Sequence, residues 1–283
     1  MVSLKEHQLV LLELLAEFDR ICCKYDISYM LFAGSALGAV RHQGFIPWDD
    51  DLDIALLRED YNKLMNIPAE EWNPEYFLQK AYSAHWPLYF SKLRKNNTTC
   101  LEKYHPKDAQ IHEGIYIDIF PIDNASDKLL VRKLQFFASK IVQARAFYLR
   151  GYETSSFTKK TVMVLSCVLP VKLFHKLVTM RRNTSSRLVH SFLGGSVKFQ
   201  KGVFDRKWIT DTIDMPFETL TVPVSSYYHD LLTMQYGDYM SLPPEEDRKC
   251  KVHAILVDTE RNYTEYEHYR DGMTFDVLTK SIR

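Results

Sequence analysis

The sequence predicts an α+β protein, a mixed β-sheet flanked by helices, and three observations support this class. Several short apolar runs alternate as strands do, an amphipathic helical pattern precedes them, and a long basic stretch of helical character follows them. With 283 residues and 46% apolar composition, the chain is long enough to bury a sizeable core. We expect one compact catalytic unit that carries a basic insertion.

The first predicted element is a helix that begins near residue 4. Ser3-Leu4-Lys5-Glu6 has the capping-box pattern, and the chain shows no secretory signal peptide. The apolar residues that keep helical spacing after it are Leu11, Leu14, Phe18, Ile21 and Tyr25. This face is predicted to lie in the core.

A strand and a turn follow, and together they predict a phosphate-binding site. Residues 29–33 form an apolar run of strand length, which ends at Gly34-Ser35 before a helix-compatible stretch, residues 36–40. Free backbone N–H groups at a strand-to-helix turn bind phosphate well. Gly34 allows close backbone approach, and Ser35 can cap the helix or hydrogen-bond an anion.

Carboxylates cluster in residues 49–53. If residues 51–56 form a strand, Asp51 and Asp53 share one face while Leu52, Ile54 and Leu56 face the core. Two adjacent carboxylates repel each other unless a proton or cation compensates, and Mg²⁺ or Mn²⁺ prefers such oxygen ligands. Asp49 shares their face and stays open as an extra ligand; a solvated turn is the alternative for the whole cluster.

A third acid, Asp118, lies in the β-rich run of residues 114–120, on the same face as Tyr116 and Phe120. An acid inside such a strand is costly without a partner, so a metal shared with Asp51 and Asp53 would explain it.

Four basic side chains are candidate phosphate ligands. Arg41 and His42 begin a loop that runs to Trp48 and is predicted to overhang the acids; a loop-anchoring ion pair and a surface imidazole are their alternatives. Lys92 and Arg94 share one face of a predicted strand over residues 89–94, after a helix over residues 58–66. Their alternative is a solvated strand face.

Charge is distributed unevenly along the chain. Residues 128–210 contain 17 Lys and Arg against two acids, Glu153 and Asp205, near +15, whereas the chain as a whole has 36 of each sign and the remainder is near −15. An anionic partner is expected for this segment. Its apolar run, residues 162–169, is too short to span a bilayer, so it either lies on a membrane or packs in a helical core. No nucleic-acid-binding motif accompanies the charge, and we expect no nucleic acid partner.

The remaining features concern the C-terminal part and the cysteines. Residues 225–236 predict a helix closed by Gly237, and Leu242-Pro243-Pro244-Glu245 predicts the start of another. Asp238 fits a helix-end turn. Five cysteines without metal or redox spacing favour a reducing cytosol.

Three blocks of the sequence resemble the LicD family of phosphotransferases, named for bacterial phosphocholine transfer. The first is residues 34–54, Gly-Ser-Ala-Leu-Gly-Ala-Val-Arg-His-Gln-Gly-Phe-Ile-Pro-Trp-Asp-Asp-Asp-Leu-Asp-Ile. The second is residues 117–123, and the third runs from Tyr236-Gly237-Asp238-Tyr239 to Leu242-Pro243-Pro244. The resemblance implies a nucleotidyltransferase-like fold whose two-carboxylate motif is Asp51 and Asp53 and whose third acid is Asp118.

The resemblance implies a metal-dependent transfer of a phospho-alcohol, phosphocholine first, from a CDP-activated donor such as CDP-choline. The expected acceptor is a hydroxyl of a glycan or lipid-linked glycan, a lipopolysaccharide or teichoic-acid precursor. Asp51, Asp53 and Asp118 would hold Mg²⁺ or Mn²⁺. Two alternatives stay open: a nucleotidyltransferase that moves a nucleoside monophosphate to a sugar or alcohol phosphate, and a non-enzymatic module that binds anionic glycans.

The predicted organisation has three parts. Residues 1–127 form the catalytic core, residues 128–210 the basic and mostly helical insertion, and residues 211–283 a helical part that packs on the core. We expect a cytoplasmic protein, with peripheral contact to the inner face of the membrane through the basic segment.

Overall fold

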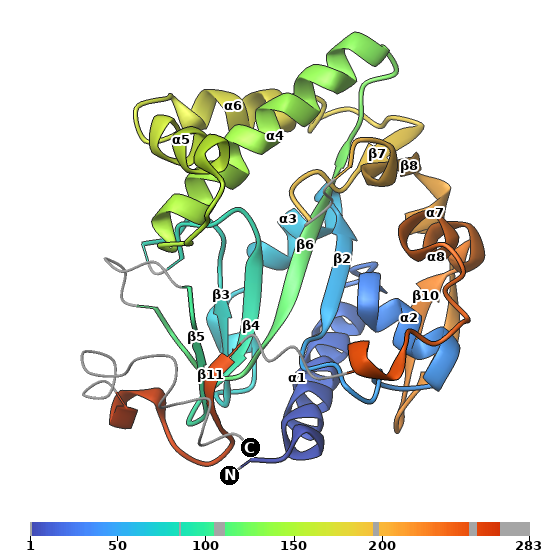
Figure 1. The fold of residues 1–283 in the computed structure, drawn as a ribbon. Coiled ribbons are helices and arrows are strands. Elements are labelled where there is room, and N and C mark those ends of the chain that lie inside the picture. Colours follow the sequence, from blue (N-terminus) through green and yellow to red (C-terminus); the bar gives the residue numbers. More distant parts are fainter. Residues whose placement is uncertain (1, 85, 105–110, 195–197, 249–253, 267–283) are drawn as a thin grey trace.

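A mixed sheet is the centre of the molecule, as the computed structural model of the chain shows for residues 2–84, 86–104, 111–194, 198–248 and 254–266 (Figure 1). Its strand order is β1-β2-β6-β4-β3, and β7 and β8 extend it from β6. The strands are β1 Met30–Leu31, β2 Asp53–Leu57, β3 Tyr76–Gln79, β4 Ser91–Lys95, β6 Tyr116–Asn124, β7 Leu188–His190 and β8 Val203–Asp205. The α+β prediction is confirmed.

Strand β6 is the central strand of this sheet. It runs parallel to β2 and antiparallel to β4, and its C-terminal end pairs with β7, where Asp123 lies opposite His190. Because β6 contacts three other strands, a side chain in its middle has neighbours on both sides. Asp118 occupies such a position.

One face of the sheet is covered by α1 (Leu4–Lys24) and α3 (Arg58–Met65). The capping box of α1 is present as predicted, and the predicted core residues Leu11, Leu14, Phe18 and Ile21 are fully buried. Leu52, Ile54 and Leu56 join the same core, which confirms their predicted direction.

Helix α2 and the C-terminal elements lie beside β1 and β2 (Figure 1). The elements are α2 Ala33–His42, α7 Lys207–Thr210, α8 Tyr228–Tyr236, and the hairpin of β9 Thr212–Phe217 and β10 Leu220–Ser225. Met30, Ala55 and Ile122 form a second core with Ile209 of α7 and Leu231 of α8. Helix α2 contacts both α8 and β9. Gly237 closes α8 at φ 78°, as predicted.

Strand β1 is shorter and α2 longer than predicted, for a local reason. Phe32 N–H still bonds to Asp53 O, but Ala33 then takes a left-handed φ of 48°, and Phe32 O accepts from Ser35 N and Ala36 N. The chain therefore enters the helix three residues earlier than expected. Gly34 and Ser35 lie in its first turn and Arg41 and His42 in its last.

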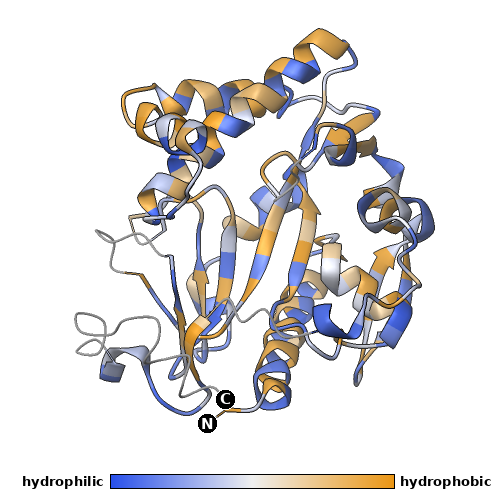
Figure 2. Cartoon of the chain, viewed as in Figure 1, coloured by the Kyte–Doolittle hydropathy of each residue, from blue (hydrophilic) through white to orange (hydrophobic). Residues whose placement is uncertain are grey.

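Three helices form a separate layer beyond the end of β6: α4 Leu129–Leu149, α5 Phe157–Leu165 and α6 Val171–Val178 (Figure 1). They pack on one another, and the chain then returns to the sheet through β7. The basic segment is thus helical to Val178, whereas its last third contains β7, β8 and α7. Figure 2 shows hydrophobic residues along these helices. Leu130 of α4 and Phe157 of α5 are exposed to about 80%, as is Val168 in the turn between α5 and α6.

The remaining elements are a two-stranded sheet and four 3-10 helices within the described residues. β5 Thr99–Glu102 pairs with β11 Ala254–Asp258. The 3-10 helices are Ala69–Glu71, Gln200–Gly202, Glu245–Asp247 and Tyr263–Tyr266. Of the predicted free cysteines, Cys250 lies outside the described residues and the other four are unpaired. Among the helices that the structure describes, none is both long and apolar enough to cross a bilayer.

Candidate active site

Two of the predicted acids lie side by side on the central strands. Asp53 begins β2 and is the register partner of Asp118 on the parallel strand β6, so both side chains point to the same face. Ser35 Oγ accepts a hydrogen bond from Asp53 N at 2.8 Å, and Leu52 O accepts one from Asp118 N at 2.9 Å. The start of α2 therefore fixes the backbone of the acid pair.

Asp49 and Asp51 lie in the loop that leads into β2, because the strand begins two residues later than predicted. Helix α1 holds this loop: Gln8 Nε2 donates to Asp49 O at 2.9 Å, and His7 Nε2 lies 2.9 Å from Asp50 O. Burial raises the pKa of Asp53, and the charges of Asp51, Asp118 and Asp49 raise it further. Four carboxylates thus act on one another, which favours binding of a cation.

A cation from the protein already approaches Asp118. Lys92 on β4 is the register partner of Asp118, and its Nζ lies 3.0 Å from Asp118 Oδ1. This distance makes the two groups an ion pair, and Asp118 Oδ1 is buried at the contact. Burial raises the pKa of Asp118, although Lys92 opposes the shift, and burial lowers the pKa of Lys92.

The second predicted cation of β4, Arg94, belongs to a buried network around Glu102 of β5. Arg94 Nη2 lies 3.8 Å from Glu102 Oε2, Lys92 Nζ lies 3.7 Å from it, and Arg150 Nη2 lies 3.1 Å from Oε1. Burial alone would raise the pKa of Glu102, but Lys92, Arg150 and Arg94 outweigh it and lower the pKa to about 2. Tyr116 OH also donates to Glu102.

The structure therefore places Lys92 and Arg94 next to the acids, each only 1% exposed. Lys92 Nζ also lies 3.1 Å from the centre of the Tyr116 ring. Both cations are held by protein groups, so the geometry supports a positioning role toward Asp118 and Glu102. Their predicted contact with a substrate phosphate stays a prediction.

The predicted cradle lies directly against the acids. A Cβ added to Gly34 would meet Asp49 Oδ2 at 3.1 Å, and the N-cap residue of α2, Phe32, provides no side-chain hydrogen bond to the helix. Free N–H groups at a helix N-terminus attract anions such as phosphate. Gly34 and Ser35 thus bring the N-terminal end of α2 to Asp49 and Asp53, and its binding of phosphate stays a prediction.

Arg41 and His42 lie at the other end of α2, about 10 Å along its axis from Gly34 at 1.5 Å per residue. Arg41 Nη1 donates to Tyr239 O at 2.7 Å, and His42 packs edge-on against Trp48. The Arg41 contact ties α2 to the C-terminal segment, and the His42 contact ties it to the loop that follows α2. The structure does not bring them together with Gly34 and Ser35.

Two further residues belong to this site that the sequence did not single out. Partial burial and the charges of Asp53, Asp49 and Asp51 raise the pKa of Tyr236, at the end of α8, so this residue lies within electrostatic range of the acids, with 46% of its surface exposed. Glu102 binds the cations of β4. Tyr236 is the first residue of the third family-like block, which was a usable signal; for Glu102 we find none, because β5 pairs only with the distant strand β11.

The carboxylates of the site are the available ligands for a metal ion. The described residues contain no group of three or more His, Cys, Asp or Glu side chains arranged to hold an ion. Mg²⁺ binds proteins through one or two carboxylates and completes its shell with water and substrate phosphates. Asp53 and Asp118, with the buried Asp118 Oδ1, fit that chemistry.

Comparison with known proteins supports the same region. The family model described as "LicD/FKTN/FKRP, nucleotidyltransferase domain" matches residues 26–166, which include every predicted site residue. The chain is 30% identical over 261 residues to the lipopolysaccharide cholinephosphotransferase LicD of Haemophilus influenzae, and the alignment covers 88% of this chain and 95% of that protein. An uncharacterised protein of Rickettsia prowazekii is 36% identical over 94 residues, 33% of this chain and 32% of that protein.

Proposed function

The chain belongs to the LicD family of phosphotransferases, and we propose that it transfers phosphocholine from CDP-choline to a hydroxyl of a glycan of the lipopolysaccharide type. The observation that carries the proposal is the acid pair Asp53 and Asp118 at the start of α2. Lipopolysaccharide and phosphocholine come from the name of the Haemophilus influenzae relative. A teichoic-acid precursor is the second acceptor class.

In this proposal Asp53 and Asp118, with Asp51 from the preceding loop, would hold Mg²⁺ or Mn²⁺. The bound ion neutralises negative charge on the diphosphate as a P–O bond breaks. The all-oxygen donor set supports a hard cation of this kind. Asp49 contacts this group electrostatically and is a candidate fourth ligand.

The chain's own groups perform the remaining tasks. The acceptor oxygen forms a bond to the phosphorus of phosphocholine, the bond from that phosphorus to the bridging diphosphate oxygen breaks, and CMP leaves. The acceptor proton passes to the carboxylate of Asp118, whose Oδ1 lies 3.0 Å from Lys92 Nζ. Gly34 and Ser35 would bind the donor phosphates at the start of α2, and Lys92 positions Asp118.

We also propose a cytoplasmic enzyme that contacts the inner face of the membrane. The exposed apolar side chains of α5, with Lys159 and Lys160 on the same helix, support a peripheral contact. Membership of a phosphotransferase family sets aside the non-enzymatic module as the main function.

The test is a product analysis. The protein is incubated with CDP-choline, CDP-ethanolamine or CDP-glycerol, with Mg²⁺, Mn²⁺ or EDTA, and with or without deacylated lipopolysaccharide. We expect CMP and a phosphocholine-bearing oligosaccharide in the presence of metal and acceptor. Release of pyrophosphate from a nucleoside triphosphate would support the nucleotidyltransferase alternative, and acceptor-dependent CMP release that EDTA leaves unchanged would contradict the metal site.

A further inference from the structure

A buried cluster of charges beside the acid pair contains more cations than carboxylates within the described residues. Its cations are Lys92, Arg94 and Arg150, and its carboxylates are Glu102 and Asp118. Lys92 and Arg94 are each only 1% exposed, and Glu102 is 8% exposed. A buried charge without a partner is strongly unfavourable, so the two carboxylates must be shared among the three cations.

Lys92 lies between the two carboxylates. Its Nζ is 3.0 Å from Asp118 Oδ1 and 3.7 Å from Glu102 Oε2. The second distance is longer than a hydrogen bond, but a movement of the ammonium group by about 1 Å toward Glu102 would bring it into range. An ammonium group has three N–H donors on a flexible stem, so Lys92 can exchange one partner for the other without leaving the cluster.

Glu102 is oriented so that one of its oxygens faces Lys92. Its Oε1 accepts a hydrogen bond from Tyr116 OH at 2.9 Å and another from Arg150 Nη2 at 3.1 Å. Its Oε2 lies toward Lys92 and toward Arg94, whose Nη2 is 3.8 Å away. The two oxygens therefore have different tasks, since Oε1 anchors the carboxylate and Oε2 carries charge toward the ammonium group.

Arg94 leaves Glu102 Oε2 to Lys92. Arg94 Nε donates to Gln79 Oε1 at 2.7 Å and its Nη1 donates to Gly114 O at 2.8 Å. Both contacts are shorter than its 3.8 Å distance to Glu102. The guanidinium group is thus held by neutral acceptors, and the negative charge of Oε2 is available to the ammonium group.

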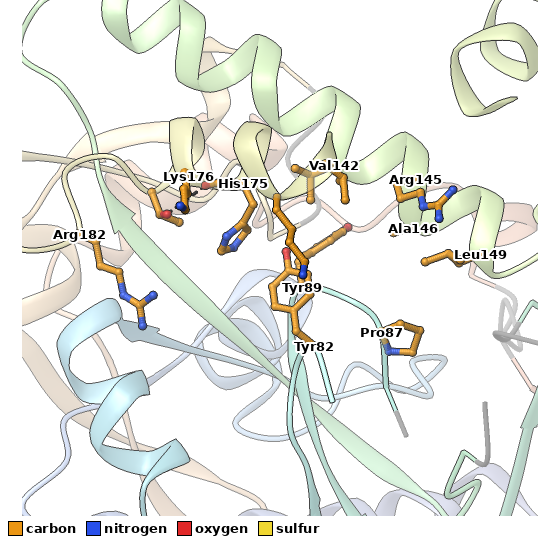
Figure 3. A pocket seen from close by; sticks show the side chains of 13 residues that line it. Tyr82, Pro87, Tyr89, Val142, Arg145, Ala146, Leu149, His175, Lys176 and Arg182 are labelled. Carbon is orange, nitrogen blue, oxygen red and sulfur yellow. Dashed lines mark hydrogen bonds between the residues drawn. The ribbon is translucent and has the colours of Figure 1, made fainter. Parts of the chain in front are cut away.

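The anchor of Glu102 comes from the helical layer. Arg150 directly follows α4 as its C-cap, and its Nε also donates to Tyr104 O at 2.8 Å. The other arginine near this end of the helix, Arg145, lines a cavity of about 510 Å³ that α6 also borders (Figure 3). Of these two arginines, Arg150 is the one that holds Glu102 in place.

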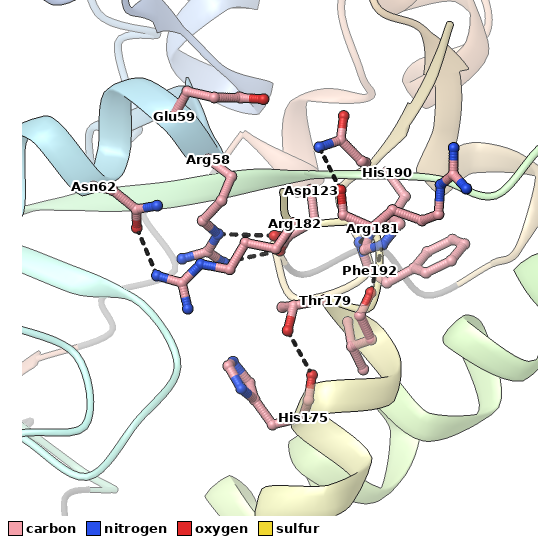
Figure 4. A network of polar contacts seen from close by, with 12 residues as sticks. Arg58, Glu59, Asn62, Asp123, His175, Thr179, Arg181, Arg182, His190 and Phe192 are labelled. Atoms are coloured by element: carbon pink, nitrogen blue, oxygen red, sulfur yellow. Dashed lines mark hydrogen bonds and ion pairs between the residues drawn. The ribbon is translucent and has the colours of Figure 1, made fainter. Parts of the chain in front are cut away.

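A second buried ion pair shows how a closed arrangement differs. Arg58 donates to both carboxylate oxygens of Asp123 at 2.8 Å, so one cation and one carboxylate satisfy each other (Figure 4). Lys92 instead has two carboxylates at unequal distances, and it approaches each of them through one oxygen. Lys92 is therefore a buried cation that can change its partner.

We propose that Glu102 is a positioning residue: it is the second counterion of Lys92 and so frees the carboxylate of Asp118 for a divalent cation. With Asp118 as its only carboxylate partner, the buried ammonium group would be left unpaired when a cation binds, which is strongly unfavourable. With Glu102 present, the ammonium group turns to Oε2. The inference rests on the proposed metal site and adds a residue that acts on this site through Lys92.

The test uses Glu102→Gln, Lys92→Met and the variant with both changes. Glu17→Gln is the matched control, because Glu17 is 7% exposed and pairs with Arg20 on α1 at 2.7 Å. Two quantities are measured without donor or acceptor: the urea midpoint in EDTA, and the affinity for Mn²⁺ by electron paramagnetic resonance. Circular dichroism checks the fold. Glu102→Asp, which keeps the charge and shortens the side chain, repeats both measurements if Glu102→Gln does not fold.

In EDTA, the urea midpoint of the double variant should fall by less than the sum of the two single variants, because both changes remove the same contact. Glu102→Gln should bind Mn²⁺ roughly tenfold or more weakly than the wild type, since Lys92 then pairs with Asp118 alone. With Lys92→Met present, the same change should weaken Mn²⁺ binding roughly threefold at most, the direct effect of one lost negative charge. Glu17→Gln should stay within about twofold and be additive with Lys92→Met. Glu102→Asp should show the same dependence on Lys92 with a smaller change.

Additive urea midpoints, or equal weakening of Mn²⁺ binding with and without Lys92, would overturn the role of Glu102. Unchanged Mn²⁺ affinity in Glu102→Gln would overturn it as well, while the proposed function would stand. A wild type that binds no Mn²⁺, together with coupled urea midpoints, would contradict the proposed metal site and leave the pairing of Lys92 with Glu102 in place.

Discussion

Three side chains in one row across the sheet, Asp53, Asp118 and Lys92, determine the charge of the candidate site. Lys92 is 3.0 Å from Asp118 and interacts also with Glu102, whereas Asp53 has carboxylate neighbours that raise its pKa. Neighbouring acids of one cluster thus have different structural roles. Asp118 balances a buried lysine, and Asp53 adds repulsion that a cation would relieve.

This difference predicts opposite effects on stability for two similar substitutions. Asp53→Asn and Asp118→Asn should each lower kcat/KM on the order of 100-fold or more, because each removes the charge of a proposed metal ligand. Asp53→Asn should leave the free energy of unfolding unchanged or higher. Asp118→Asn should lower it by roughly 3 kcal/mol, because Lys92 loses its nearest counterion. Steady-state kinetics and urea denaturation measure both; wild-type turnover in the two variants would refute the assignment.

A second residue-scale prediction concerns the buried pair of Arg58 and Asp123. Burial alone would raise the pKa of Asp123, but Arg58 outweighs it and lowers the pKa. The pair therefore stabilises the fold above the unfolded pKa of about 4, and this contribution is lost as the pH falls through the lowered folded pKa. Asp123→Asn should cost roughly 3–5 kcal/mol at pH 7. In urea titrations, the difference in free energy of unfolding between the wild type and Asp123→Asn should narrow toward pH 3. A difference that does not depend on pH would show that Arg58 does not keep Asp123 ionised.

At the scale of elements, α5 is the least buried of the three helices α4, α5 and α6 that form the helical layer. Phe157 is 82% exposed and Val164 53%, and only Met163 of this helix is buried. The ammonium group of Lys159 lies over the rings of Phe147 and Tyr152, and these contacts fix the position of its charge. An exposed helix with apolar and basic residues is typical of a contact with an anionic membrane surface.

We predict that Phe157→Ser with Val164→Ser weakens binding to vesicles with anionic lipid roughly tenfold or more, because two apolar side chains no longer insert. Leu9→Ser with Ile213→Ser is the control, since these residues are exposed to 49% and 40% on other elements. Vesicle co-sedimentation compares the variants, and CMP release with a soluble acceptor checks that the site is intact. Equal vesicle binding by the two double variants would leave α5 a structural helix.

At the scale of the whole molecule, charge is segregated. The basic segment near +15 forms the helical layer and part of the sheet edge, whereas the acids of the site lie in the remainder near −15. An anionic acceptor is therefore attracted to one part of the molecule and repelled by the other.

This arrangement predicts a salt effect specific to the acceptor. The KM for a phosphorylated oligosaccharide should rise several-fold between about 50 and 300 mM NaCl, because salt screens the attraction between the acceptor phosphates and the cations of the basic segment. The KM for a phosphatase-treated oligosaccharide of equal length should change little. Initial-rate measurements at saturating CDP-choline compare the two acceptors, and an identical salt dependence would exclude electrostatic attraction of the acceptor.

The sequence by itself determined the local features. The capping box of α1, the core face of that helix, the inward direction of Leu52 and Ile54, and the closure of α8 at Gly237 follow from patterns within a few residues. Such features depend on spacing and backbone preference, which a single segment contains. The family also follows from the sequence, because the motif of residues 34–54 is continuous.

Tertiary structure alone decided which charges meet. Lys92 faces Asp118 because β4 and β6 pair in one register, and Glu102 of β5 lies close to Lys92. Tyr236 lies within electrostatic range of the acids, although its helix is nearly 200 residues further along the chain. Because α2 runs from Ala33 to His42, Arg41 and His42 lie at the opposite end of the helix from Gly34. Pairing register and helix direction are set by packing between distant segments, so a pattern within one segment does not contain them.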